Sequence, residues 1–234
     1  GERFVDLLRD SASLLFELVR AENIACEAEQ SGWVQPVHTP GRMQIAERRV
    51  AQWSKRGAPV ALLSRDEMAA RLGSTAWHGG WANPTGGHIN PLALARGLAA
   101  ATLRHGATIF AQSPATSYTR TASGWRTETA GGQVTSRALI LATNAYTGEI
   151  APKLAADIAR EIVPIVSWQM ATRPLGDNVR RVILPGRAAM SDTHGELYFM
   201  RYDARHRLVT GGALVNPSNG AERLKPYIAQ RLQQ

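Results

Sequence analysis

The 234-residue sequence has few of the residues and motifs that would assign a function directly. Cys26 is its one cysteine, so no internal disulfide is possible and a reducing, cytoplasmic location is expected. Lysine is scarce, because three of the 27 basic residues are lysines and 24 are arginines. No apolar run approaches the roughly 18 to 20 residues of a membrane helix, so we expect no membrane span.

Motifs that would identify a catalytic or phosphate-binding site are also missing. The sequence contains no Gly-x-Gly-x-x-Gly, no Walker-type phosphate loop and no Gly-x-Ser-x-Gly nucleophile elbow. Its six histidines show no metal-ligand spacing with carboxylates or with Cys26. We therefore predict no metal site and assign no catalytic residue.

The net charge of +8 raises the question of nucleic-acid binding. The arginines are scattered, and their longest clusters are pairs such as Arg48-Arg49. A surface that follows phosphates more often has a dense basic stretch with aromatic residues between the charges. We interpret the charge as a solvated surface and expect no nucleic-acid partner.

Both ends of the chain look like boundaries inside a longer protein. The sequence begins Gly1-Glu2-Arg3, without methionine or a signal peptide, and it ends within a helix-like run. Apolar residues make up 44% and charged residues 20%, as in ordinary globular domains. The sequence leaves the oligomeric state open.

The first hundred residues alternate between helical and extended patterns. Helical spacing over 5–22 and 41–55 predicts two helices, and residues 32–38 alternate like a strand that Pro36 would place at a sheet edge. Ser64 and Glu67 form the capping box of a short helix. Asn90 and Pro91 begin a helix whose many alanines and leucines predict burial on most sides.

Strand patterns dominate the rest of the chain. The predicted strands of the first part are 107–111, the hairpin 115–121 with 125–129, and the apolar run Ala138–Ala142, which should be buried on both faces. Residues 161–172, 195–202 and 207–215 predict a second, antiparallel sheet. The tail from residue 221 has a helical pattern.

Three clusters allow both a structural and a functional interpretation. Thr85–Pro91 is either a tight turn into a helix or a turn that faces a ligand. Leu139–Tyr146 is either an ordinary strand-to-helix turn or a strand end that contacts a ligand. Glu196–Tyr202 is either a surface hairpin strand or an aromatic floor in which Arg201 pairs with a carboxylate.

In this order, the clusters resemble the D-amino-acid-oxidase-like family of FAD-dependent oxidoreductases, which includes glycine and sarcosine oxidases. The gamma-glutamylputrescine oxidase type is the most similar branch. The resemblance extends over nearly the whole chain, through the segments Gly32-Trp33 and the strand after it, Leu63–Leu72, Gly86–Pro91, Gly106–Ala115 and Ala138–Tyr146.

The resemblance implies a mixed α/β and α+β fold. Residues 1–150 would form part of an FAD-binding-type domain with a helical insertion, and residues 151–234 an interleaved antiparallel-sheet substrate domain. A backbone group at Ala115 would contact adenine, and Ala142, Thr143 and Asn144 would lie along the FAD. Tyr198 and Arg201 would face the substrate. We predict that His88, in the turn at Gly86-Gly87, also binds the substrate.

The resemblance also implies an activity, which is oxidation of an amine or amino acid by hydride transfer to the flavin. FAD is the cofactor expected for the full-length protein, and the partner is a small amine or amino-acid substrate. Family members carry a Gly-x-Gly-x-x-Gly that this chain lacks, so we expect the isolated chain to be inactive and not to hold FAD. The alternative is a non-enzymatic small-molecule-binding module on the same fold.

Overall fold

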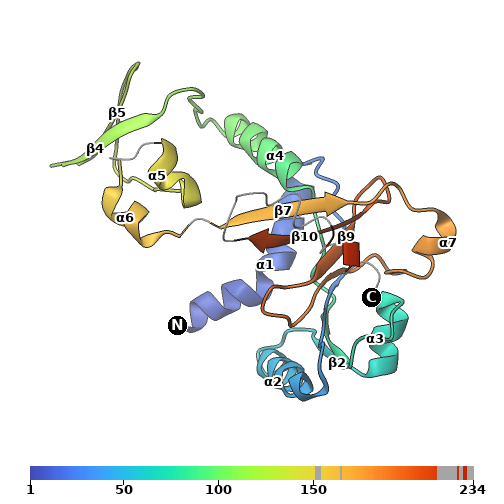
Figure 1. Ribbon diagram of the computed structural model, residues 1–234. Helices are drawn as coiled ribbons and strands as arrows, with labels where there is room; N and C mark the ends of the chain where they lie inside the picture. The colour runs from blue at the N-terminus through green and yellow to red at the C-terminus, as the bar shows by residue number, and fades with distance from the viewer. Residues whose placement is uncertain (151–153, 164, 215–225, 227–228, 231–234) are drawn as a thin grey trace. The chain divides into compact units, whose positions relative to one another are not determined.

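The computed structural model describes residues 1–150, 154–163, 165–214, 226 and 229–230 (Figure 1). The chain divides into two compact units: Gly1–Ala101 together with Val166–Gln234, and Thr102–Ile165. This division differs from the boundary near residue 150 expected from the sequence, and the assignment of functional domains stays a prediction.

Most described helices belong to the first unit. They are α1 (Glu2–Ala21), η1 (Pro40–Arg42), α2 (Met43–Ser54), α3 (Arg65–Leu72), α4 (Pro91–Arg104), which extends beyond the unit at its end, and α7 (Asp177–Arg180). The helices predicted from apolar spacing over 5–22 and 41–55 are therefore confirmed. Within the described residues, no helix combines the length and the apolar character needed to cross a membrane.

A seven-stranded mixed sheet forms the centre of the first unit, in the order β2-β3-β1-β8-β9-β10-β7. Its strands are β1 (Trp33–Pro36), β2 (Ala61–Leu63), β3 (Gly80–Asn83), β7 (Val166–Ala171), β8 (Ala189–Ser191), β9 (Phe199–Tyr202) and β10 (Leu208–Leu214). The pairing of β1 with β8 is parallel, and every other neighbouring pair is antiparallel. The three predicted late strands are confirmed, but they join the early strands in one sheet instead of forming a second one.

The prediction that Pro36 marks an edge strand is wrong, because β1 lies between β3 and β8. The register shows why proline is tolerated there. On the β8 side only Trp33 and Val34 are paired, so the ladder ends before Pro36 and needs no N–H from it.

The largest apolar core is built around this sheet by α3 and the central strands. The capping box at the start of α3 is confirmed: the amide of Glu67 donates to the Ser64 hydroxyl, and the Ser64 amide donates to the Glu67 carboxylate. The helix then directs Met68 and Leu72 into the core, where they join the fully buried Tyr202. A local signal in the sequence thus orients residues that pack against strands far along the chain.

A second cluster joins α1 to α4 through the loop that follows α1. Asn90 caps α4 as predicted, because its Oδ1 accepts from the Ala93 amide at 3.1 Å. The prediction that α4 is buried on most sides is wrong: Leu92 is 60% and Leu103 is 52% exposed, and Ala101 is its one buried residue. Alanine and leucine favour the helical conformation wherever they lie on the helix, so their number does not show how many faces are buried. The face of α4 that packs in this cluster is the one that contacts the loop at Ile24.

The second unit contains a three-stranded antiparallel sheet and short helices. Its elements are β4 (Ala115–Thr121), β5 (Gly124–Thr129), β6 (Gly132–Ser136), η2 (Asn144–Tyr146), α5 (Thr147–Ile150) and α6 (Ala156–Glu161). The predicted hairpin between β4 and β5 is confirmed.

Two strands predicted in this unit are not present. Residues 107–111 and Ala138–Ala142 have no strand structure, and Ile140 is 86% exposed. An apolar run becomes a buried strand only beside a hydrogen-bonding neighbour, and the described pairings give neither segment one. The helix expected from residue 221 falls almost entirely outside the described residues.

We predict that Gly97→Ala lowers the free energy of unfolding by at least about 1 kcal/mol, the cost of overpacking. An exchange of glycine for alanine within a helix normally stabilises it by about 1 kcal/mol. At position 97, however, a Cβ would lie 2.2 Å from Cγ2 of Ile24, a branched side chain that cannot move away freely. Urea denaturation measures the change, and Gly41→Ala, with no atom within 4 Å of its Cβ, is the control.

Candidate functional site

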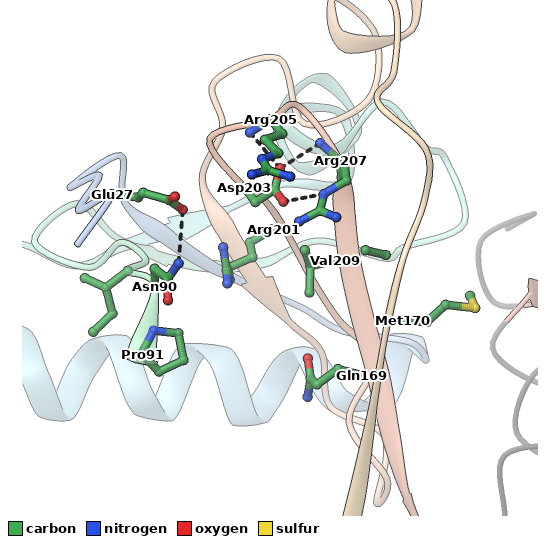
Figure 2. Close-up of a pocket in the computed structure, with 12 residues that line it drawn as sticks. Glu27, Asn90, Pro91, Gln169, Met170, Arg201, Asp203, Arg205, Arg207 and Val209 are labelled. Atoms are coloured by element: carbon green, nitrogen blue, oxygen red, sulfur yellow. Dashed lines mark hydrogen bonds and ion pairs between the residues drawn. The ribbon is translucent and has the colours of Figure 1, made fainter. Parts of the chain in front are cut away.

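The first unit contains a pocket of about 770 Å³ on one side of β7, β9 and β10 (Figure 2). This volume is within the range of roughly 300–1,000 Å³ that small-molecule sites occupy. Its lining consists of charged and polar side chains with a few apolar ones: Glu27, Ile89, Asn90, Pro91, Gln169, Met170, Ala171, Arg201, Asp203, Arg205, Arg207 and Val209.

The strand register places several of these residues side by side on neighbouring strands. Val209 pairs with Arg201 on β9 and with Ala171 on β7, while Gly211 pairs with Gln169. Side chains two residues apart in a strand point to the same face, so Arg201 and Gln169 share the face that borders the pocket. Tyr202, on the opposite face of β9, is fully buried in the core.

Asp203 organises the turn between β9 and β10. Its Oδ1 accepts from the amides of Arg205 and Arg207, each at 2.9 Å, and its Oδ2 accepts from Nε of Arg207 at 2.7 Å. Burial alone raises the pKa of this carboxyl, but the hydrogen bonds from Arg207 and Arg205 together hold the pKa below its usual value. The turn therefore carries an ionised carboxylate that fixes Arg207 in place.

Arg201 has a different environment, because no described carboxylate neutralises its guanidinium. Within the described residues it makes no ion pair, and its one hydrogen bond goes to the carbonyl oxygen of Tyr202 at 3.2 Å. Figure 2 shows its side chain between the strands and the wall that carries Glu27 and Asn90. The side-chain amide of Asn90 donates through Nδ2 to the Glu27 carboxylate at 3.5 Å. The pocket thus offers a free cation on one wall and an anion on another.

A half-buried ion pair lies behind the pocket. Arg187 binds the Glu29 carboxylate through two nitrogens, at 2.7 and 2.9 Å, and also donates to the carbonyl of Asp203 at 3.3 Å. The bidentate pair is the stronger geometry for arginine and carboxylate. It connects the segment before β1 to the turn that carries the pocket arginines.

Of the predicted substrate-facing residues, Arg201 lines the pocket and the other two do not. Tyr198 packs against the large core and stacks on His194, with ring centroids 4.2 Å apart. His88 is buried beside Glu29 and borders a separate pocket of about 250 Å³. Burial lowers the pKa of His88, although the Glu29 carboxylate opposes the shift.

The four predicted FAD-contacting residues belong to the second unit. Ala115 begins β4 next to a register irregularity, and Ala142 is exposed in a segment without regular structure. The hydroxyl of Thr143 hydrogen-bonds that of Thr147 at 2.7 Å. Asn144 has a φ of 48° and accepts from the Ala145 amide. Their contact with FAD stays a prediction.

Sequence reasoning missed most of the pocket lining. Glu27 and Gln169 carry no motif, and only the fold brings them to the same cavity. Asp203 had a usable signal, since an aspartate four residues before an arginine in a polar turn typically accepts local amides.

Comparison with known proteins gives a consistent result for family and fold. The family model described as DAO, FAD dependent oxidoreductase, matches residues 1–234. Gamma-glutamylputrescine oxidoreductase from Escherichia coli (strain K12) is 24% identical over 227 residues, which are 97% of this chain and 52% of the relative. The chain spans about half the length of this relative.

Solved structures show the same fold at low sequence identity. Glycine oxidase from Bacillus cereus superposes with a TM-score of 0.72 at 15% identity, covering 95% of this chain and 62% of that one. L-proline dehydrogenase from P. horikoshii gives a TM-score of 0.69 at 14% identity, over 87% and 54% of the two chains. The mixed fold expected from the sequence is confirmed.

We predict that Asp203→Asn lowers the free energy of unfolding at neutral pH by about 1–3 kcal/mol and flattens its loss in acid. The folded pKa of Asp203 is lowered, so its stabilisation is complete above the unfolded pKa of about 3.9 and disappears as the pH falls towards the folded pKa. Denaturant titrations at neutral and acidic pH measure both effects.

The matched control is Asp177→Asn, whose side chain is 69% exposed and pairs with Arg180 three residues away. It should change stability little, because exposed ion pairs contribute little. Equal effects of the two substitutions would show that the buried turn has no special role.

Proposed function

This chain belongs to the DAO family of FAD dependent oxidoreductases, and we propose that it is part of an enzyme that oxidises an amine or amino acid with FAD as the electron acceptor. The proposal for the substrate class is supported by the names of the relatives and structural neighbours, which include gamma-glutamylputrescine oxidoreductase and glycine oxidase. The alternative of a non-enzymatic binding module has no comparable support. A cytoplasmic location stays a prediction.

The observation that carries the substrate proposal is the guanidinium of Arg201, which pairs with no carboxylate in the described part of the chain and lies in a pocket that also contains Glu27. Arginine forms charge-assisted hydrogen bonds with a carboxylate, and a protonated amine is attracted to a carboxylate. A small amino acid carries both groups. We propose that Arg201 binds its carboxylate and Glu27 its amine, while Val209 and Pro91 provide apolar contact.

The described residues do not by themselves fit the whole of FAD. The sequence has no Gly-x-Gly-x-x-Gly to hold the pyrophosphate, and the segment Ala138–Ala142 that leads to the predicted contacts is not a strand. The role proposed for Arg201 and Glu27 is therefore substrate binding, and no reaction step is assigned to them.

We predict that Arg201→Gln weakens binding of glycine to the chain at least about tenfold, the effect of losing one charge-assisted hydrogen-bonding partner. Methylamine, which lacks the carboxylate, should bind the variant and the unmodified chain equally. NMR titration of each ligand gives the dissociation constants.

Arg173→Gln is the control, because Arg173 is exposed and lies outside the pocket lining. The substrate proposal fails if Arg201→Gln affects both ligands alike, or if Arg173→Gln weakens glycine binding as much.

We also predict that the isolated 234-residue chain binds FAD more weakly than micromolar and has no oxidase activity. The reason is the missing pyrophosphate motif, since a helix N-terminus with close backbone approach is what normally holds that group. Titration of the chain followed by flavin fluorescence measures the affinity, and saturation at micromolar FAD would contradict the prediction.

A further inference from the structure

A second polar cluster lies at the carboxyl ends of β1 and β8, and it shares no residue with the pocket lining. His38 follows β1 by two residues, Asp192 directly follows β8, and His194 is two residues further. Because β1 and β8 are parallel, their carboxyl ends meet at the same edge. The fold thus joins residues whose spacing in the sequence predicted no metal site.

Asp192 is the buried centre of the cluster, with 0% of its surface exposed. Its Oδ1 accepts from the amides of His194 at 3.0 Å and Tyr198 at 2.9 Å, and its Oδ2 hydrogen-bonds Nδ1 of His194. Three donors thus hold this buried carboxylate in place. Donation of Nδ1–H by His194 to Asp192 would leave the imidazole lone pair on Nε2.

His38 is held in a similar way. Its Nδ1 lies 2.9 Å from Oγ1 of Thr193, and its ring stacks on that of His194 with centroids 3.7 Å apart and planes 15° apart. Tyr198 stacks on the other face of His194.

This arrangement has the parts of a transition-metal site. One ligand atom each from His38, Asp192 and His194 can be chosen so that all lie within 4.8 Å of one another. Neutral imidazole suits zinc, copper and nickel, and a carboxylate on the far nitrogen of a ligating histidine is the usual outer partner. The positive charge of Arg42 near His38 opposes any cation there, so the site needs the Asp192 carboxylate to offset it.

We propose that His38 and His194 bind a divalent transition-metal ion, for which Zn²⁺ is the probe, through their imidazole nitrogens. Asp192 orients His194 and compensates the charge of the ion. Both histidines are partly exposed, and binding requires the His38 ring to turn from the stacked arrangement while the hydrogen bond to Asp192 holds His194. Water completes the coordination.

The test is calorimetric titration of the untagged, metal-free chain with ZnCl₂. We expect one Zn²⁺ per chain, and at least about tenfold weaker binding for His38→Gln and for His194→Gln. His105→Gln is the control, because this histidine lies in the second unit, outside the cluster, and should leave binding unchanged. Absence of saturable binding, or equal weakening by His105→Gln, overturns the proposal.

A second measurement needs no substitution. Diethylpyrocarbonate modifies accessible imidazoles, and mass spectrometry locates the modified residues. Zn²⁺ should protect His38 and His194 while the modification of His105 continues. Equal modification of His38 and His194 with and without Zn²⁺ contradicts the site even if a variant chain fails to fold.

Discussion

The parallel pairing of β1 with β8 holds the early and late parts of the first unit in one sheet. Only Trp33 with Ala189 and Val34 with Met190 are in register, so the main-chain contact is short. Side chains extend it: the indole of Trp33 donates to the hydroxyl of Ser191 at 3.0 Å, across 158 residues of sequence. The pocket and the histidine cluster both depend on the pairing of β1 with β8, because each combines residues from the early and the late part of the chain.

Arg187 reinforces the same join from the other end of β1. Besides its bidentate contact with Glu29, its guanidinium lies 5.3 Å from the ring centroid of Tyr202. The cost of removing both charges from water offsets much of the attraction between them, so the ion pair adds little net stability. Loss of one partner would leave an uncompensated charge, and the pair therefore acts mainly as a constraint on geometry. It keeps β9 and the turn at Asp203 in a fixed position relative to the start of β1.

Local signals in the sequence were sufficient for the parts of the fold that depend on neighbours along the chain. The capping box at Ser64 and the Asn90 cap were predicted because a cap involves residues three positions apart. The alternation of a strand likewise accounts for Arg201 lining the pocket while Tyr202, the next residue, lies in the core. These features need no knowledge of the rest of the molecule.

The wrong or missing predictions all concern distant partners. Pro36 looks like an edge residue until the register of β8 is known, and the run Ala138–Ala142 has strand character but no described neighbour to pair with. Glu27 and Asp192 were not recognised, because no spacing pattern connects them to the residues they meet. The family resemblance supplied the fold class, whereas the composition of the pocket needed coordinates.

The distance in sequence between β1 and β8 affects how the chain emerges from the ribosome. At roughly 5–20 residues per second, β1 waits about 8 to 32 seconds for its parallel neighbour to be synthesised. During that time one side of β1 presents unpaired amides and carbonyls to other nascent chains. The unpaired side of β1 is therefore the edge most open to wrong pairing while the chain is being synthesised.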